Sequence, residues 1–183
     1  MASILDIKEK VQTDDSIKSL ENGEYQPIIG SQLNTAGQIE ITIENTDDFY
    51  YPNRSYLVLQ GKLLKRADGA VFNDADNVTL TNNGLMYLFT NVKYSLSGSE
   101  IESLNHPGFA TTMLSSIKYP NSFKKGYGLM QCWYPDSGTD ASLNDNCGFN
   151  ICQSYIIKSP NPKGSFCFAI PLEHAFVFCE DYE

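Results

Sequence analysis

The chain changes from an irregular polar sequence to strict alternation at residue 38. Isoleucines alternate with polar residues over 38–44, which predicts a strand with one apolar face and one solvent-facing side. Residues 1–27 are mostly polar with a weak helical rhythm, and we interpret them as an N-terminal arm. Residues 28–183 are then assigned to one domain.

Four further segments concentrate the apolar, aromatic and β-branched residues that are typical of strands. They cover residues 56–64, 85–96, 149–158 and 166–172. The first of them is apolar almost without interruption, so we expect both of its faces to be covered. The sequence Ser-Gly-Ser-Glu at residues 97–100 predicts a turn directly after the second.

One short helix is predicted near residues 108–117. Met113, Leu114 and Ile117 fall there at helical spacing. Pro107 comes just before this run, and proline is well tolerated at a helix start because its missing N–H would have no partner there.

Two long polar stretches, residues 65–84 and 124–147, separate these elements. Loops longer than about 15 residues are uncommon in compact domains unless they are functional or mobile. Several strands, one helix and long loops together predict an all-β protein, an antiparallel jelly-roll β-sandwich.

Composition narrows the function classes. A length of 183 residues suits one domain plus an arm. Thirteen basic against 22 acidic side chains give a net charge of -9, which disfavours direct binding to nucleic acid. No segment approaches the roughly 18 apolar residues of a membrane span, and no cleavable signal is recognisable, so we expect a protein that is not secreted.

Catalytic and metal-binding patterns are missing from the sequence. His106 precedes the predicted helix and is expected to serve a turn or cap, whereas His174 lies among aromatics and is expected to be buried with its partners satisfied. No G-x-S-x-G elbow or C-x-x-C pair occurs. We therefore expect no enzyme, no metal and no cofactor, and reduced, mostly buried thiols at the five cysteines. These are Cys132, Cys147, Cys152, Cys167 and Cys179.

The loop at 124–147 holds the candidate contact residues. Lys124 and Lys125 are either a solvated pair or partners of an acidic neighbouring subunit. Tyr127, Trp133 and Tyr134 offer aromatic surface for an inter-subunit contact, or for stacking on a sugar.

Several segments in order along the chain resemble one family of capsid proteins. They are residues 38–44, 56–61, 92–101, 105–112, 148–151 and 163–174. Together they are similar to the double jelly-roll major capsid proteins of Polinton/Maverick elements, adintoviruses and virophages, and to copies of these integrated in animal genomes.

This resemblance implies a structural protein without catalysis. In that family, two jelly rolls lie in one chain, three chains form a capsomer, and capsomers tile a shell. Residues 28–183 would correspond to the first jelly roll, truncated at its C-terminal end because five strands are predicted instead of eight. The expected partners are copies of the chain, as a homotrimer, and other capsid proteins.

The expected location follows from the same resemblance. It is the virion, or the cytoplasm or nucleus if the chain is a shortened, domesticated genomic relative. The alternative is a carbohydrate- or peptide-binding β-sandwich, since the architecture does not fix the function.

Overall fold

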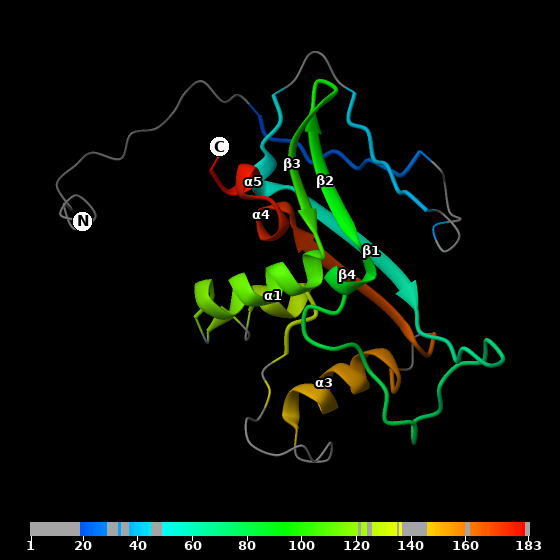
Figure 1. The fold of residues 1–183 in the computed structure, drawn as a ribbon. Coiled ribbons are helices and arrows are strands. Elements are labelled where there is room, and N and C mark those ends of the chain that lie inside the picture. The colour runs from blue at the N-terminus through cyan, green and yellow to red at the C-terminus, as the bar shows by residue number, and fades with distance from the viewer. Residues whose placement is uncertain are drawn as a thin grey trace. The chain divides into compact units, whose positions relative to one another are not determined.

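The computed structural model describes residues 19–28, 33, 37–44, 49–120, 122–123, 126–134, 136, 146–159 and 162–181. The chain divides into two compact units, Met1–Phe49 and Tyr50–Glu183. Every helix and strand found in the described ranges belongs to the second unit (Figure 1).

The strand predicted at 38–44 is not present. Ile39, Ile41 and Ile43 are exposed, and the segment has no strand pairing. One backbone bond reaches it from the same unit, from the N–H of Ile28 to the carbonyl of Glu40 at 3.0 Å. Alternation alone does not make a strand, because the apolar side needs a surface that buries it.

Strands β1 (Tyr56–Lys62) and β4 (Ser165–Pro171) form a two-stranded antiparallel sheet, in register from Tyr56 opposite Pro171 to Lys62 opposite Ser165. The strands predicted at 56–64 and 166–172 are therefore confirmed. The expectation that both faces of β1 are covered is wrong, since its residues alternate between exposed and half-buried.

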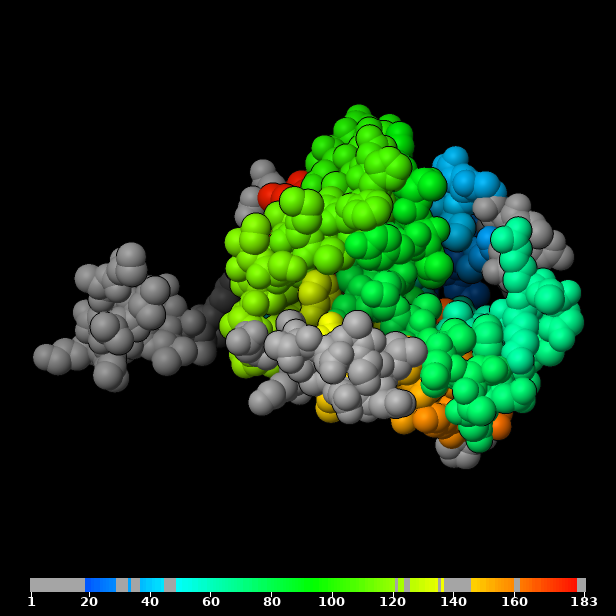
Figure 2. Space-filling view, turned by 60° about the horizontal axis from the view of Figure 1, so that its bottom comes forward, coloured from blue at the N-terminus to red at the C-terminus, as the bar shows by residue number. Residues whose placement is uncertain are grey.

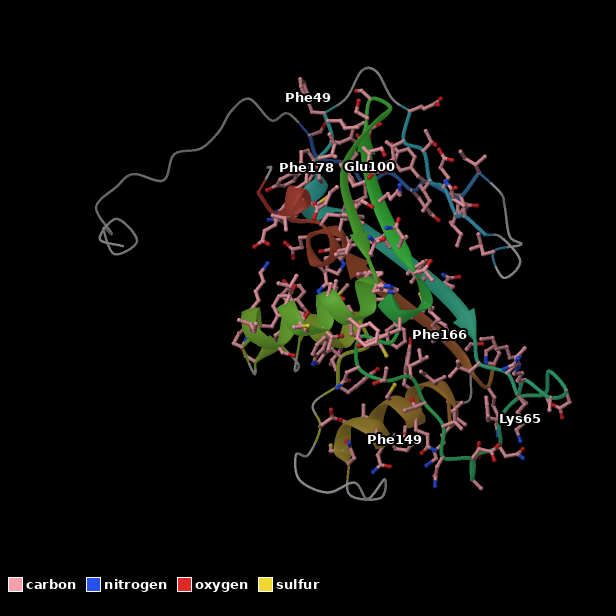
Figure 3. All side chains as sticks on the ribbon, in the orientation of Figure 1. Phe49, Lys65, Glu100, Phe149, Phe166 and Phe178 are labelled. Atoms are coloured by element: carbon pink, nitrogen blue, oxygen red, sulfur yellow. The ribbon has the colours of Figure 1, made fainter. Side chains whose placement is uncertain are left out.

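A close approach fixes the identity of one β1 residue. Gly61 lies opposite Phe166, which Figure 3 labels, in the register. The Phe166 ring occupies the space that a Cβ at position 61 would need. Glycine is the residue that leaves this space open, and the ring covers the backbone there.

Strands β2 (Asn91–Leu96) and β3 (Ser99–Asn105) form a hairpin. The turn residues Ser97 and Gly98 have φ of 50° and 79°, and two left-handed residues in a row are what a two-residue hairpin turn of type I′ requires. The predicted turn is confirmed, whereas β3 was not predicted as a strand.

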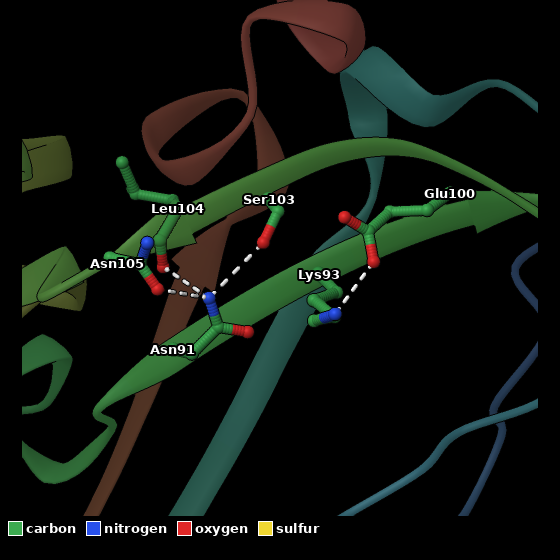
Figure 4. Close-up of polar contacts among 6 residues, drawn as sticks. All are labelled: Asn91, Lys93, Glu100, Ser103, Leu104 and Asn105. Atoms are coloured by element: carbon green, nitrogen blue, oxygen red, sulfur yellow. Dashed lines mark hydrogen bonds and ion pairs between the residues drawn. The ribbon is translucent and has the colours of Figure 1, made fainter.

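Polar side chains hold the hairpin strands together (Figure 4). The side-chain amide of Asn91 donates to Ser103 Oγ at 3.1 Å and to Asn105 Oδ1 at 2.8 Å. Lys93 Nζ pairs with Glu100 Oε2 at 2.6 Å. All three contacts run between β2 and β3, and cross-strand side-chain pairs are the usual unit of sheet stabilisation.

The helices occupy more of the chain than predicted. In the described ranges the helical elements are η2 (Pro52–Arg54), η3 (Met86–Leu88), α1 (Pro107–Lys118), α2 (Tyr127–Met130), α3 (Cys147–Ile156), α4 (Leu172–Ala175) and α5 (Val177–Asp181). Helix α1 confirms the predicted helix, with proline at its start. The first half of the strand predicted at 85–96 is a 3-10 turn instead.

The strand predicted at 149–158 is wrong, because this segment forms α3. Asn146 caps the helix, its side-chain oxygen accepting from the N–H of Phe149 at 3.1 Å. Gly148, Cys152 and Ile156 are buried at intervals of four residues, so the apolar side follows the helical period.

A side chain of the hairpin caps the last helix. Both carboxylate oxygens of Glu102 on β3 accept backbone N–H bonds at 3.1 Å, one from Val177 and one from Phe178. The Tyr94 ring of β2 packs against Phe176 and Phe178, with centroids 5.6 and 5.2 Å apart. The hairpin and the C-terminal helices are thereby joined.

The core lies between β4, α3 and two connecting segments. Its buried residues are Leu85, Met86, Cys132, Tyr134, Cys152, Ile156, Ile157, Phe168 and Ile170. With four short strands in two separate sheets and helices packed beside them, the described fold is mixed α and β. The prediction of an all-β jelly-roll sandwich is wrong, because apolar segments expected as strands form helices and turns.

Candidate interaction surface

Three of the five predicted contact residues lie among the described residues, and they differ in exposure. Lys124 and Lys125 lie outside the described residues. Tyr127, at the start of α2, is 69% exposed, whereas Trp133 and Tyr134 are only 6% and 7% exposed. The structure therefore gives no exposed aromatic platform at Trp133 and Tyr134.

Backbone bonds explain why Tyr134 is held inside. Its N–H donates to Asn82 Oδ1 at 2.7 Å, and its carbonyl accepts from Asn82 Nδ2 at 2.8 Å. The Asn82 side chain thus pairs with Tyr134 as a neighbouring strand would, and Tyr134 becomes part of the core.

Helix α1 has its apolar residues on the outside. Its buried residues are small or polar: Pro107, Gly108, Thr111 and Ser115. Its large apolar residues are between 55% and 86% exposed: Phe109, Met113, Leu114 and Ile117. A surface helix of a globular protein normally has the opposite arrangement.

A buried polar cluster accounts for this orientation. Asn83 is 1% exposed, and its side-chain nitrogen donates to Thr111 Oγ at 2.7 Å and Thr112 Oγ at 2.9 Å. The Thr111 hydroxyl donates in turn to the carbonyl of Pro107 at 2.6 Å. Because buried polar groups need partners, these bonds fix the threonine side of α1 against the domain.

His174 completes the cluster. Its Nε2 lies 3.2 Å from Asn83 Oδ1 and its Nδ1 lies 3.3 Å from the Tyr119 hydroxyl. Burial, with a smaller effect of Lys118, lowers the pKa of His174 to about 4, so the ring is neutral at pH 7. Since Asn83 Oδ1 accepts only, Nε2 carries the proton and Nδ1 accepts from Tyr119. The prediction of a buried, satisfied histidine is confirmed.

His106 has the predicted role at the start of α1. It is the N-cap residue, with φ of 49°, and its carbonyl accepts the first helical N–H, from Phe109, at 3.1 Å. The prediction of a turn or cap position is therefore confirmed.

The outward residues of α1 continue onto the neighbouring turn. The Tyr87 ring meets Phe109 edge to face with centroids 5.2 Å apart, and it lies against Gly108, where a Cβ would come within 2.5 Å of it. We define the α1 surface as Tyr87, Phe109, Met113, Leu114 and Ile117. Figure 2 shows the yellow-green residues of α1 at the molecular surface.

Charge is nearly absent from α1 itself. Lys118 is the one charged residue of α1, and its Nζ pairs with Glu180 Oε1 at 2.6 Å. Exposed apolar residues that form a contiguous patch without charge are typical of protein contact sites.

Other kinds of site find less support in the structure. Among the described residues, no three His, Cys, Asp or Glu side chains are placed to hold a metal ion. The same residues include no helix with the length and apolarity to cross a bilayer. Comparison with protein-family models, curated proteins and solved structures found no match.

Proposed function

We propose that this chain is a structural protein that acts by associating with copies of itself through the α1 surface. The observation that carries the proposal is the outward apolar side of α1. Its four large residues are exposed, although the polar side of the same helix is buried on Asn83.

The energetics favour an association that depends on concentration. Burying a large apolar side chain contributes up to about 1.5–3 kcal/mol, so Phe109, Met113, Leu114 and Ile117 would contribute at most about 6–12 kcal/mol from each of two copies before costs. Lost translational and rotational freedom costs about 4–15 kcal/mol. The gain and the cost are of similar size, so we expect an association that depends on protein concentration.

A second copy is the occupant that this surface suits best. An apolar helix side without a central charge is complementary to itself across a two-fold axis, and helices pack on each other through such residues. Neither a catalytic step nor a cofactor is part of the proposal.

The narrower form of the proposal is a capsid role, in trimeric capsomers with other capsid proteins. Its support is the sequence resemblance alone. The described fold does not add to it, because the jelly roll that builds such capsomers is not the fold found.

The carbohydrate-binding alternative loses its main support. Trp133 and Tyr134 are buried, and of the three aromatic residues considered for stacking only Tyr127 is available on the surface.

Sedimentation velocity of the full chain tests the proposal. We expect the average mass to rise across about a hundredfold range of concentration. The variants Met113→Glu and Ile117→Glu should stay monomeric over that range, because each places a charge in the contact.

Asn77→Glu is the matched control, since it adds the same charge to an exposed position outside α1 and should associate like the wild type. A wild type that is monomeric throughout, or glutamate variants that associate unchanged, would refute the role of the α1 surface. Far-ultraviolet circular dichroism confirms that each variant is folded.

A further inference from the structure

Two thiols face each other in the core. Cys132 follows α2 and Cys152 lies in α3, 20 positions further along the chain, and their sulfur atoms are 4.0 Å apart. Cys132 is 0% and Cys152 is 2% exposed. No disulfide bond joins any of the five cysteines, so the pair is reduced here.

Both sulfurs lie against neighbouring backbone carbonyls. Cys132 Sγ lies 3.8 Å from the carbonyl of Thr81, and Cys152 Sγ lies 3.7 Å from the carbonyl of Leu80. Because these carbonyls belong to adjacent residues, the two thiols are held next to each other from two separate elements.

Cys132 is also fixed in an unusual conformation. Its φ is 58°, which is uncommon for a residue other than glycine. Its carbonyl accepts from the N–H of Asn83 at 3.2 Å, and its N–H donates to the carbonyl of Leu129 at 3.3 Å. A residue stays in this strained conformation only where surrounding contacts hold it there. The fold therefore fixes the position of the Cys132 sulfur.

We propose that Cys132 and Cys152 are a redox modification site that closes to an intramolecular disulfide when the protein meets a peroxide. A disulfide has its sulfurs about 2 Å apart, so closure needs the two sulfurs to approach each other by about 2 Å. Side-chain rotation and small shifts of α3 supply movements of this size.

The electrostatics assign the first step to Cys152. The hydrogen bond between the two sulfurs lowers the pKa of Cys152, whereas the same interaction and burial raise the pKa of Cys132. The thiolate is the reactive form of cysteine, so Cys152 is the sulfur that attacks.

The chemistry balances with peroxide as the oxidant. The Cys152 thiolate attacks one peroxide oxygen, the S–O bond forms, the O–O bond breaks, and hydroxide leaves. The Cys132 sulfur then attacks the Cys152 sulfenic acid, the S–S bond forms, the S–O bond breaks, and a second hydroxide leaves. The two thiol protons join the two hydroxides, so two thiols and one hydrogen peroxide give one disulfide and two waters.

The pair lies in the core cluster beside a groove. The groove has Tyr134 and Phe168 of that cluster among its walls, together with Cys167, but neither Cys132 nor Cys152 lines it. Hydrogen peroxide is hardly larger than water, so a small local opening of the core is enough to admit it to the pair.

Mass spectrometry of the full chain tests the site. We treat the reduced protein with hydrogen peroxide, alkylate the remaining thiols, and digest the unfolded protein with chymotrypsin, because cleavage after Phe149 and Tyr155 separates Cys152 from every other cysteine. The expected product is a cross-linked peptide of Cys132 and Cys152 that dithiothreitol separates.

Thermal unfolding supplies a second readout. The closed loop of about 20 residues should raise the melting temperature by roughly 10 °C, and reduction should reverse the shift. Cys152→Ser should show neither the cross-link nor the shift, whereas Cys147→Ser, which changes an exposed thiol of the same helix, should show both.

Two results would overturn the proposal. One is oxidation of Cys147 or Cys167 while Cys132 and Cys152 stay reduced. The other is a disulfide that pairs either of the two with a different cysteine. Both are read from the wild type and Cys147→Ser, so the conclusion does not depend on Cys152→Ser folding normally.

Discussion

Replacing Asn83 with alanine removes the side chain that holds α1 to the domain. The wild-type amide donates to Thr111 and Thr112 and accepts from His174. All of these groups except Thr112 are buried, so water cannot readily replace the lost partner.

The cost can be estimated from two contributions. The Nε2–H of His174 is left buried without an acceptor, which costs about 1–3 kcal/mol. Thr111 keeps its bond to the Pro107 carbonyl and adds little. The backbone at position 83 has φ of 59°, and alanine tolerates this region less well than asparagine, by about 1 kcal/mol. We expect a loss of about 2–4 kcal/mol in the free energy of unfolding, or roughly 5–15 °C in melting temperature.

Calorimetry or circular dichroism melts of three variants separate these contributions. Asn83→Gly loses the amide but accepts positive φ, so it should be about 1 kcal/mol less destabilised than Asn83→Ala. Asn77→Ala, at an exposed position, is the control and should change stability by less than about 0.5 kcal/mol. If Asn83→Ala falls within the range of Asn77→Ala, the cluster does not anchor α1 and the reasoning is wrong.

Three further predictions concern stability. Gly61→Ala makes a methyl group overlap with the Phe166 ring and should lower the free energy of unfolding, measured in urea, by about 1–3 kcal/mol. The double variant with Phe166→Leu should regain part of this loss. Glu102→Ala removes both acceptors from the start of α5 and should cost about 0.5–2 kcal/mol in urea unfolding. The pKa of His174 in the folded protein, about 4, lies below its ordinary value of 6.5. As the pH falls from about 6.5 towards 4, this histidine therefore binds a proton in the unfolded chain but not in the folded one. The free energy of unfolding decreases over this range by at most about 3 kcal/mol. His174→Gln should therefore lose less melting temperature than the wild type between pH 7.5 and pH 5, measured by calorimetry.

Each of these has a contrary outcome. Equal urea midpoints for Gly61→Ala and wild type would show that the ring moves aside without cost. An unchanged midpoint for Glu102→Ala would show that water replaces the cap. If the melting temperatures of His174→Gln and the wild type change in parallel with pH, groups other than His174 cause the loss of stability in acid.

Local signals in the sequence were sufficient for some elements. Strands β1 and β4, helix α1 and the turn at Ser97 and Gly98 each have a pattern that depends on neighbouring residues: a short apolar run, a proline at the helix start, or a glycine where φ is positive. Such signals survive packing because they act over a few residues.

Helix α3 shows where composition misleads. Its aromatic and β-branched residues favour a strand, and the helical signal was weaker but present. Asn146 is a good N-cap residue, and Cys152 and Ile156 are spaced by one helical turn. Tertiary packing against β4 decides between the two structures.

The candidate surface could not be predicted at all from its own residues. Met113, Leu114 and Ile117 have the spacing of a helix side, but which side faces outward depends on Asn83, a residue in a distant turn. Trp133 and Tyr134 looked like loop aromatics, and the bonds to Asn82 that bury Tyr134 are 52 positions away. Contacts between residues so far apart in the sequence cannot be inferred from the local pattern of apolar and polar residues.

The pairing of β1 with β4 has a consequence for synthesis on the ribosome. Lys62 ends β1 and Ser165, its partner, begins β4, so about 100 residues must be translated between them, which takes roughly 5–20 s. During that time the inner side of β1, with Leu57 and Leu59, has no strand to pair with. The nascent chain therefore exposes an unpaired apolar strand early in synthesis. A chaperone that binds this strand should raise the yield of folded protein.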